Sequence, residues 1–374
     1  MEFFNPVQFN ISSGSRKKII DESLGKSVLV FCSKTAFNRL TKDKLLSALF
    51  NQTNIIFDHS FGNNPSLEDI KSISRMYQTY SFDLIIGIGG GSTMDVAKVA
   101  CISIPAYKIG ISIEELLINT NINPGLKAID CIQVPTTAGT GSELTHFATI
   151  WDYEKKQKKS LNHPSMFAKK AYIDPDFLSE IPIDIAIATA LDALNQAFES
   201  IWNLNANLFT RSMARHAIVL GLECLPIIND INDDPSLRTK LCIASVSAGM
   251  AISQTRTSIC HSISYPLTLK YGIDHGLACA FSMIAVYKFN LLSIASDINI
   301  IRNYIKEDPL IVIESIFKKH DLYARLAKSL PSKAKFSSEI EEFITTGRFE
   351  NNIRKCSRED LVEILNTSYD CVMN

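Results

Sequence analysis

The sequence has no excess of charge of either sign. Its 374 residues include 38 Lys and Arg against 39 Asp and Glu, a formal net charge of −1 at pH 7. These charges form no long run, so the chain lacks the basic stripe with which many proteins bind nucleic acid. Hydrophobic residues make up 46% of the chain and charged residues 21%, a mixture that excludes disorder, collagen and coiled-coil rods. We therefore expect a globular protein with a small-molecule partner and no nucleic acid.

The sequence also lacks paired cysteines and long apolar runs. Its nine cysteines are scattered, never in C-x-x-C spacing and mostly within apolar runs such as residues 27–33, which predicts buried, reduced thiols. Polar residues interrupt every apolar run well before eighteen positions, and the start of the chain has neither the basic residues nor the apolar stretch of a signal peptide. We expect a cytoplasmic protein with no membrane partner.

The two halves of the chain differ in their hydrophobic pattern. The first alternates short β-rich runs with amphipathic stretches, which is typical of a parallel sheet with crossover helices. The predicted strands are residues 27–33, 54–58, 83–88, 130–134 and 171–174. Helical periodicity replaces this pattern after the turn at 181–184, with Asp184 as the candidate N-cap and later helices that include 276–292 and 310–328. The sequence thus predicts an α/β domain over residues 1–182 and an all-helical domain over 183–374.

Glycine and hydroxyl residues follow two of the predicted strands. Residues 89–92 read GGGS before a segment with the composition of a helix start, so backbone N–H groups and a helix N-terminus could hold a phosphate there. A tight strand-to-helix turn explains the same residues equally well, because they match neither the G-x-G-x-x-G fingerprint nor the P-loop. Residues 135–143, PTTAGTGSE, follow another strand and add hydroxyls that suit ribose and phosphate oxygens. Together, two such loops at adjacent strand ends favour nucleotide binding.

Carboxylate, amide and imidazole side chains recur in the helical half. Asp192 and Gln196 are four residues apart and therefore share one helix face. His261 and His275 follow, fourteen residues apart. Imidazole and carboxylate suit Fe(II), Zn, Co, Ni or Mn, and such a site with an open position can polarise a carbonyl as a Lewis acid. Isolated histidines are more often packed or surface residues than ligands, so these residues alone leave metal binding open.

The chain resembles the iron-containing (group III) alcohol dehydrogenases. The resemblance covers most of residues 1–290 and runs through GGGSTMDVAK (89–98), PTTAGTGSELT (135–145), ALDALNQAFES (190–200) and the spacing of the two histidines. It implies a Rossmann-like dinucleotide-binding domain and an all-helical domain that binds metal and substrate. It further implies NADPH or NADH, one divalent metal (Fe2+ or Zn2+) and a homodimer or larger homo-oligomer.

This resemblance implies metal ligands at Asp192, His261 and His275. The fourth ligand position, ordinarily histidine, is Gln196 here. A carboxamide oxygen is a weaker ligand than imidazole, so the site either binds metal less tightly or uses three protein ligands and a water. Tyr265 replaces a further family histidine. In an aldehyde reduction, Tyr265, a metal-bound water and the ribose hydroxyl are the candidates to protonate the alkoxide product.

The resemblance places the nicotinamide cofactor on the two loops. The implied contacts are Gly89, Gly90, Gly91 and Ser92 with the pyrophosphate, Asp95 behind them, Thr136, Thr137, Thr140 and Ser142 with adenine and ribose, and Lys158 and Leu178 with the nicotinamide end. Ser33 and Lys34 stand at the end of the first predicted strand, where NAD-specific relatives place an Asp. Without that carboxylate we expect NADPH to be used at least as well as NADH. The alternative is that Lys34 simply points to solvent.

The expected reaction is the reduction of a small aldehyde to a primary alcohol. Residues 199–207, 253–268 and 275–281 resemble the family members that convert phosphonoacetaldehyde to 2-hydroxyethylphosphonate. Arg256 is the first candidate to bind the phosphonate, with His146 as the second, although an ordinary salt bridge explains Arg256 as well. The main alternative is a general alcohol or polyol dehydrogenase with uncharged substrates. A lyase related to dehydroquinate synthase and a metal-free nucleotide-binding protein are further alternatives.

Overall fold

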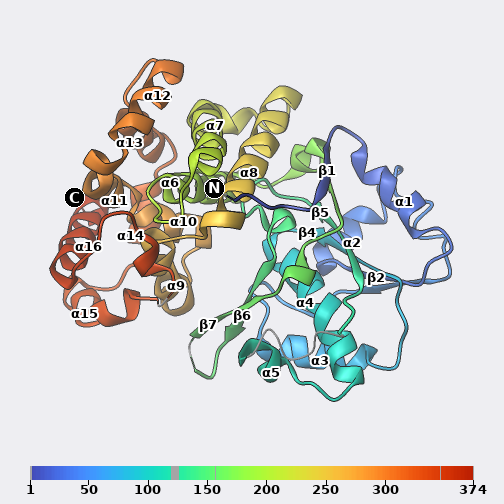
Figure 1. Cartoon of the computed structure of the whole chain (residues 1–374). Helices are drawn as coiled ribbons and strands as arrows, with labels where there is room; N and C mark the ends of the chain where they lie inside the picture. Colours follow the sequence, from blue (N-terminus) through green and yellow to red (C-terminus); the bar gives the residue numbers. More distant parts are fainter. Residues whose placement is uncertain (1, 119–125, 156, 346, 374) are drawn as a thin grey trace. The chain divides into compact units, whose positions relative to one another are not determined.

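A computed structural model describes residues 2–118, 126–155, 157–345 and 347–373. The chain divides into two compact units (Figure 1), which we call the α/β unit and the helical unit. The α/β unit comprises Asn5–Thr137 and Gly141–Leu178, and the helical unit comprises Ser179–Asn374 with the short segments Met1–Phe4 and Ala138–Thr140. The domain border that we predict between residues 182 and 183 stays a prediction.

Six parallel strands form the sheet of the α/β unit, in the order β1-β8-β5-β4-β2-β3. Their bounds are Gln8–Ile11 (β1), Val28–Phe31 (β2), Ile55–Asp58 (β3), Leu84–Gly89 (β4), Asp130–Pro135 (β5) and Lys170–Ile173 (β8). Each predicted strand overlaps one of β2, β3, β4, β5 and β8, with bounds that differ by one or two residues, so the α/β prediction is confirmed. Strand β1 was missed, since its four residues carry too little periodicity to signal a strand.

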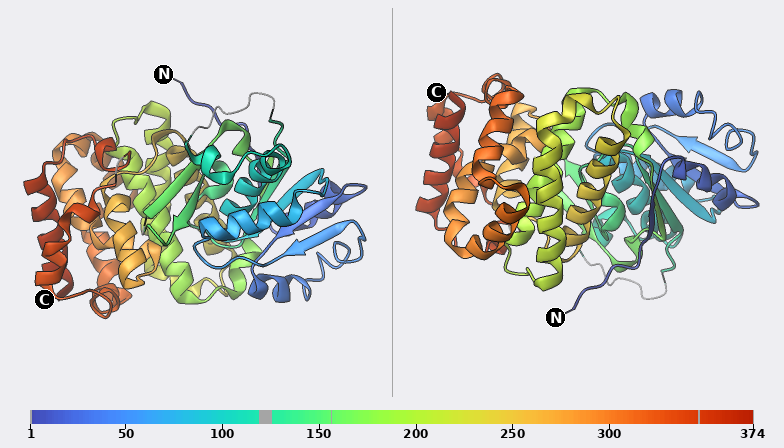
Figure 2. Two further views of the ribbon diagram at one scale, coloured as in Figure 1. Left: turned by 90° about the horizontal axis from the view of Figure 1, so that it is seen from below. Right: turned by 90° about the horizontal axis from the view of Figure 1, so that it is seen from above.

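Helices cover both faces of this sheet, as Figure 2 shows. Side chains alternate along a strand, so Leu29 and Phe31 of β2 join one apolar cluster while Val28 and Val30 join another. The first cluster includes α3 (Leu67–Tyr77), α4 (Gly91–Lys108) and α5 (Ile113–Ile118), and the second includes α1 (Lys18–Ser23) and α2 (Lys34–Leu40). Burial on both faces explains why the central strands are continuously apolar in sequence.

The α/β unit also contains an antiparallel hairpin, which was not predicted from the sequence. It pairs β6 (Phe147–Asp152) with β7 (Gln157–Asn162) and is labelled in Figure 1. Strand β7 reads QKKSLN, which is almost entirely polar and has only one buried residue. A strand with so few apolar residues gives no alternating hydrophobic signal.

The helical unit is built on three long helices that pack against one another. These are α6 (Ile183–Ile201), α7 (Leu208–Cys224) and α8 (Pro235–Thr255), and α9 (Ile259–Tyr271) and α10 (His275–Phe281) follow. The chain then continues through α11 (Met283–Asn290), α12 (Ala295–Ile305), α13 (Pro309–Lys319), α14 (Leu322–Ala327), α15 (Lys333–Ser338) and α16 (Arg358–Met373). The helical second half is therefore confirmed.

Several helix boundaries differ from the prediction. Helix α6 begins at Ile183 after Pro182 as N-cap, so Asp184 lies in the first turn and is not the cap. The predicted helix 276–292 is broken at Ser282, where α10 ends and α11 begins, and the predicted helix 310–328 is broken between α13 and α14. Asp321 has a φ of 50° at the second break. A left-handed residue ends a right-handed helix.

One segment is long and apolar enough to span a membrane by length and composition alone. It runs from Met283 to Ile305 among the described residues, and an 18-residue window within it has a mean hydropathy of 1.3. This is weak evidence for a membrane span, because half of that window is buried inside the protein. It also comprises two helices, α11 and α12, rather than one uninterrupted helix.

All nine cysteines are free thiols, and all of them except Cys356 and Cys371 are buried. The apolar surroundings predicted for these thiols are thus confirmed for most of them.

Candidate functional site

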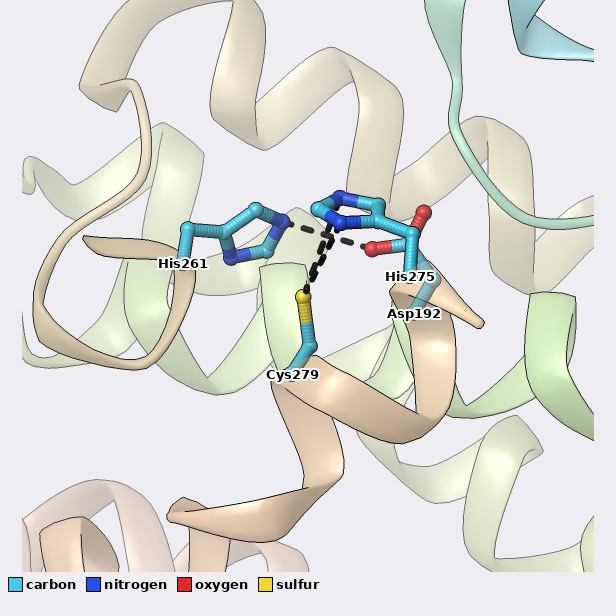
Figure 3. Close-up of side chains that lie close together, drawn as sticks. All are labelled: Asp192, His261, His275 and Cys279. Carbon is cyan, nitrogen blue, oxygen red and sulfur yellow. Dashed lines mark hydrogen bonds and ion pairs between the residues drawn. The ribbon is translucent and has the colours of Figure 1, made fainter. Parts of the chain in front are cut away.

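Four side chains from three helices of the helical unit meet at one point (Figure 3). Asp192 comes from α6, His261 from α9, and His275 and Cys279 from α10. One ligand atom from each of the four lies within 4.8 Å of the others. His261 Nε2 is 3.3 Å from Asp192 Oδ1, and the two imidazole rings have their centroids 5.4 Å apart. The structure thus brings together the three residues that the resemblance implies as metal ligands.

Gln196, which we predicted as the fourth ligand, lies one turn after Asp192 on α6. Its side chain is buried, and its Oε1 has no hydrogen-bond partner among the residues that the structure describes. An i, i+4 pair of polar residues is often solvated surface, but both members of this pair are buried here. The role of Gln196 as a ligand stays a prediction.

The meeting of α6 and α10 depends on a glycine. A Cβ on Gly276 would lie 1.7 Å from the carbonyl oxygen of Ala188, so only glycine allows this approach. A second contact lies one turn further along α10, where the carbonyl oxygen of Cys279 accepts a hydrogen bond from Asn195 Nδ2 of α6 at 2.9 Å. These two contacts fix α10 against α6, so that His275 and Cys279 lie beside Asp192.

Glu199 fixes the orientation of His261. Its Oε2 lies 2.7 Å from His261 Nδ1 and accepts from the backbone N–H of Ser258 at 2.9 Å, while its Oε1 accepts from the N–H of His261 at 3.1 Å. A carboxylate on Nδ1 leaves Nε2 to face the cluster, which is how ligating histidines are commonly held. Sequence reasoning missed Glu199, although its position, seven residues after Asp192, puts it on the same helix face.

The electrostatics of the cluster favour a cation. Burial by itself raises the pKa of Asp192, but His261, His275 and Gln196 bring it below its ordinary value. Burial by itself lowers the pKa of His261, yet Cys279, Glu199 and Asp192 raise it well above its ordinary value. Ionised acids beside histidines that attract protons form a pocket in which positive charge is stabilised. Carboxylate, imidazole and thiolate are also the donors that Zn2+ and Fe2+ use in proteins, so these residues fit the implied metal.

Cys279 is the second residue that sequence reasoning missed. It lies four residues after His275, so the spacing that relates Asp192 to Gln196 would have indicated it. Burial raises the pKa of its thiol, but His261 and His275 lower it to about 7.

Arg256 lies at the C-terminal end of α8 in an unusual backbone conformation. Its φ is 61° and its ψ is −179°, a region that is essentially restricted to glycine and costs roughly 1–3 kcal/mol for other residues. Such strain is kept mainly at functional sites. Burial and the positive charge of Arg348 lower the pKa of the Arg256 guanidinium. A second arginine, which we did not predict, therefore lies near the first.

Three carboxamides hold the backbone of this turn, and two of them come from the segment 199–207. Asn203 Nδ2 donates to the carbonyl of Arg256 at 3.2 Å, and Asn205 Nδ2 donates to that of Thr255 at 3.4 Å. Asn351 Nδ2 donates to the carbonyl of Thr257 at 2.9 Å. Two of the stretches that suggest phosphonoacetaldehyde, 199–207 and 253–268, are thus a single hydrogen-bonded structure.

Tyr265 is buried on α9, and its ring is nearly parallel to that of His275, with centroids 6.2 Å apart and an interplanar angle of 9°. The tyrosine therefore lies next to the cluster. Its part in proton transfer stays a prediction.

The two predicted nucleotide loops begin at neighbouring strand ends of the α/β unit. Gly89, the last residue of β4, pairs with Pro135, the last residue of β5. The N–H of Thr136 donates to the carbonyl of Gly89 at 3.0 Å. Helix α4 begins at Gly91 with Gly90 as its N-cap. The adjacency that favours one nucleotide site is therefore present.

Side chains of α4 support the second loop. Asp95 Oδ1 accepts from Ser142 Oγ at 2.5 Å, and Asp95 Oδ2 accepts from the N–H of Thr149 at 2.7 Å. Lys98 Nζ donates to the carbonyl of Ser142 at 2.9 Å and to Thr145 Oγ1 at 2.9 Å. These contacts explain Asp95 and Ser142 as residues that position the loops.

The remaining predicted residues are more scattered. Ser33 is the N-cap of α2, where its Oγ accepts from the N–H of Ala36 at 3.1 Å, and Lys34 is the exposed first residue of that helix. Lys158 lies on β7, Leu178 is buried after β8, and the ring of His146, just before β6, packs on Phe167. Thr137, beside Gly90, and the half-buried Ser92 lie at the two loops, while Thr140 lies in the short segment that belongs to the helical unit. Their roles in cofactor or substrate binding stay predictions.

Two family models match the chain almost from end to end. Residues 6–175 match the iron-containing alcohol dehydrogenase model, and residues 186–369 match the C-terminal model of the Fe-containing alcohol dehydrogenase family. The chain belongs to the iron-containing alcohol dehydrogenase family. This result confirms the family that the sequence motifs indicated. The protein is therefore an enzyme of a class that depends on a nicotinamide cofactor and a metal.

Two relatives have sequences similar to this alcohol dehydrogenase. The phosphonoacetaldehyde reductase of Streptomyces viridochromogenes is 32% identical over 229 residues, which are 60% of this chain and 57% of the relative. The 1-propanol dehydrogenase of Salmonella typhimurium is 29% identical over 272 residues, which are 73% of this chain and 69% of the relative. The similarity to the first relative therefore spans little more than half of that protein.

The fold is also that of solved structures. The crystal structure of the iron-containing alcohol dehydrogenase of Thermotoga maritima has a TM-score of 0.85 at 25% identity, and the match covers 99% of each chain. This agreement confirms the predicted fold class.

Proposed function

We propose that this alcohol dehydrogenase reduces phosphonoacetaldehyde to 2-hydroxyethylphosphonate with NADPH or NADH. The observation that carries the reaction type is the cluster of Asp192, His261 and His275, of which Asp192 and His261 are buried and His275 is half-buried. A bound Fe2+ or Zn2+ would polarise the aldehyde carbonyl, and the nicotinamide would supply the hydride. We further propose residues 1–182 as the dinucleotide-binding domain and 183–374 as the metal- and substrate-binding domain.

The residues of the cluster would prepare the site for that chemistry. Asp192 supplies a carboxylate that its neighbours keep ionised. Glu199 holds His261 so that its Nε2 faces the other ligand atoms. Because these side chains are buried and tied to the backbone, little reorganisation is needed when a metal and a carbonyl oxygen enter.

The turn at Arg256 supports an anionic substrate. A guanidinium offers paired donors that match phosphonate oxygens, and the nearby Arg348 adds a second positive charge. A dianion beside both side chains would offset the repulsion between them. The backbone of Arg256 is strained. Asn203 holds the carbonyl of Arg256, and Asn351 holds the carbonyl of Thr257. We expect such strain at a residue that serves function rather than stability.

The test compares phosphonoacetaldehyde with an uncharged aldehyde of similar size, for the wild type, Arg256→Ala and Arg256→Gly. We expect the wild type to prefer the phosphonate by about a hundredfold in kcat/KM, about 2.7 kcal/mol, and both variants to lose that preference. Arg256→Gly also relieves the backbone strain, so its free energy of unfolding should exceed that of Arg256→Ala by about 1–3 kcal/mol. A wild type that reduces both aldehydes equally well would contradict the phosphonate proposal.

A second candidate is a general alcohol dehydrogenase with uncharged substrates. The similarity to the 1-propanol dehydrogenase favours it, because that match spans more of both chains than the match to the phosphonoacetaldehyde reductase. Equal use of both aldehydes in the same assay would support this candidate.

We also propose that the enzyme is a cytoplasmic homodimer or larger homo-oligomer of a phosphonate-producing pathway. The support is the resemblance to family members that reduce phosphonoacetaldehyde. Light scattering on the purified protein tests the assembly, and a monomer would contradict it.

A further inference from the structure

We infer that Cys279, rather than Gln196, is the fourth protein ligand of the metal. Its ligand set would be one carboxylate, two imidazoles and one thiolate, from Asp192, His261, His275 and Cys279 (Figure 3). The aldehyde oxygen would then bind as a fifth ligand, since catalytic zinc can expand to five-coordination. The inference rests on the proposed metal-dependent function and changes its ligand set. It predicts a sulfur–metal bond that the family pattern of Asp and His ligands does not contain.

The distances in the cluster suit a single ion. Bonds of about 2.3 Å to sulfur and about 2.0–2.1 Å to nitrogen or oxygen, at tetrahedral angles, separate neighbouring ligand atoms by roughly 3.3–3.6 Å. Cys279 Sγ lies 3.8 Å from His275 Nε2, and Asp192 Oδ1 lies 3.3 Å from His261 Nε2. These two pairs are within a few tenths of an ångström of that separation. All four ligand atoms lie within 4.8 Å of one another, so the widest pair would close by roughly 1 Å around a bound ion.

The backbone of α10 holds Cys279 in place. His275 and Cys279 are four residues apart and project from the same face of this helix, and Figure 3 shows the sulfur directed toward both imidazole rings. The carbonyl of Cys279 accepts the hydrogen bond from Asn195 on α6, and Gly276 contacts the backbone of the same helix. The thiol is fully buried, so its position beside the ligands is set by packing and not by an exposed, mobile side chain.

Ligand chemistry also favours the thiol over the carboxamide. A thiolate is a strong, soft ligand that suits Zn2+, whereas a neutral carbonyl oxygen suits harder ions such as Mg2+ and Ca2+. The thiol loses its proton on binding, which is the ordinary course for a cysteine ligand. Gln196 Oε1 is buried one turn after Asp192 and has no hydrogen-bond partner among the described residues, so Gln196→Ala is the matched variant for the alternative ligand. We therefore expect this site to prefer Zn2+ and Co2+ over Mg2+.

The test is spectroscopy of the full-length protein loaded with one metal ion per chain. X-ray absorption of the zinc form should show one sulfur at about 2.3 Å and nitrogen or oxygen for the rest. The cobalt form should show sulfur-to-cobalt charge transfer in the near ultraviolet. Both signals should vanish in Cys279→Ser and persist in Gln196→Ala. They should also persist in Cys224→Ser, which removes a buried thiol from α7.

Metal titration gives a second readout. We expect Cys279→Ser to weaken zinc binding by roughly a hundredfold or more, since changes to residues that only support ligands already cost 10–100-fold. A wild-type zinc site without sulfur would overturn the inference, even if Cys279→Ser failed to fold. If the wild-type enzyme had no sulfur ligand but still reduced aldehydes in a metal-dependent way, the proposed function would stand and only the assignment of Cys279 as a ligand would be wrong.

Discussion

The candidate sites of the two units differ in the groups that form them, which are mainly backbone in the α/β unit and side chains in the helical unit. In the α/β unit, the loops after β4 and β5 consist largely of glycine and hydroxyl residues, and the buried Lys98 and half-buried Asp95 support them. In the helical unit, the cluster consists of side chains on α6, α9 and α10. One site thus depends on where the backbone runs, and the other depends on which side chains the helices carry.

This difference explains where the chain departs from its family. The glycine loop is constrained by its backbone, because a Cβ on Gly89 would collide with Thr93. In the helical site, the resemblance implies a family ligand histidine at the position of Gln196, and the structure places Cys279 beside Asp192, His261 and His275. A site made of side chains can change its ligands while the helices stay in place, so we expect metal and substrate preference to vary there.

The largest effect is expected from Asp192→Ala, which removes a carboxylate from the cluster. Metal binding should be lost, and aldehyde reduction should fall by roughly a thousandfold or more, because polarisation of the carbonyl contributes several kcal/mol. NADPH binding, measured by fluorescence titration, should be unchanged, since the loops do not include this residue. Asp184→Ala is the control on the same helix, because Asp184 is exposed and forms only a surface ion pair with Arg325. Retention of metal by Asp192→Ala would contradict the cluster.

A smaller loss is expected from Glu199→Gln, because this change disturbs a ligand without removing it. The amide cannot accept from the N–H groups of both Ser258 and His261 while also facing His261 Nδ1. Metal affinity should fall roughly 10–100-fold, as for other residues that orient ligands. Isothermal titration with zinc measures the affinity. An unchanged dissociation constant would show that Glu199 supports the fold alone.

In the α/β unit, alanine variants of two adjacent glycines should have different effects, one on stability and the other on cofactor binding. A Cβ on Gly89 would lie 2.5 Å from Thr93 Oγ1 and 2.7 Å from Thr93 Cβ, so Gly89→Ala should destabilise the protein by about 2 kcal/mol. A Cβ on Gly90 would lie 3.6 Å from Thr137 Oγ1, an ordinary contact, so Gly90→Ala should change stability by less than about 0.5 kcal/mol. We expect Gly90→Ala instead to weaken NADPH binding, because the methyl group would stand at the N-cap of α4. Denaturant unfolding and NADPH titration of both variants test this, and equal stabilities would contradict it.

The smallest effect is expected from Lys34→Asp at the start of α2. A carboxylate here would repel the 2′-phosphate of NADPH and favour the 2′-hydroxyl of NADH. The ratio of kcat/KM for NADPH to that for NADH should fall by roughly tenfold. Lys18→Asp, on α1 of the same unit, serves as the control for charge alone. A constant ratio would show that Lys34 is a solvated surface residue.

Much of the fold could be predicted because its signals are local. The buried strands β2, β4 and β5 read as mostly apolar runs, followed within two residues by serine, glycine and threonine, respectively. The hairpin β6–β7 could not be predicted, because β7 is polar and its pairing with β6 leaves no pattern in its own residues. Helix ends at Pro182, Ser282 and Asp321 depend on single backbone angles, which hydrophobic periodicity does not report.

The candidate site could be predicted only where family residues mark it. Asp192, His261 and His275 come together as the resemblance implies. Cys279 and Glu199 were missed because a buried cysteine and a buried acid have many roles, and only the crossing of α6, α9 and α10 brings them to the histidines.

The most direct test of the central claim is removal of the metal. Purified protein is assayed for metal content and for NADPH oxidation with phosphonoacetaldehyde, before and after treatment with a chelator and after addition of Zn2+ or Fe2+. We predict one divalent metal per chain, loss of activity in proportion to metal removed, and recovery when the metal is restored. Full activity in metal-free protein would contradict the claim that the cluster of Asp192, His261 and His275 holds the metal on which aldehyde reduction depends.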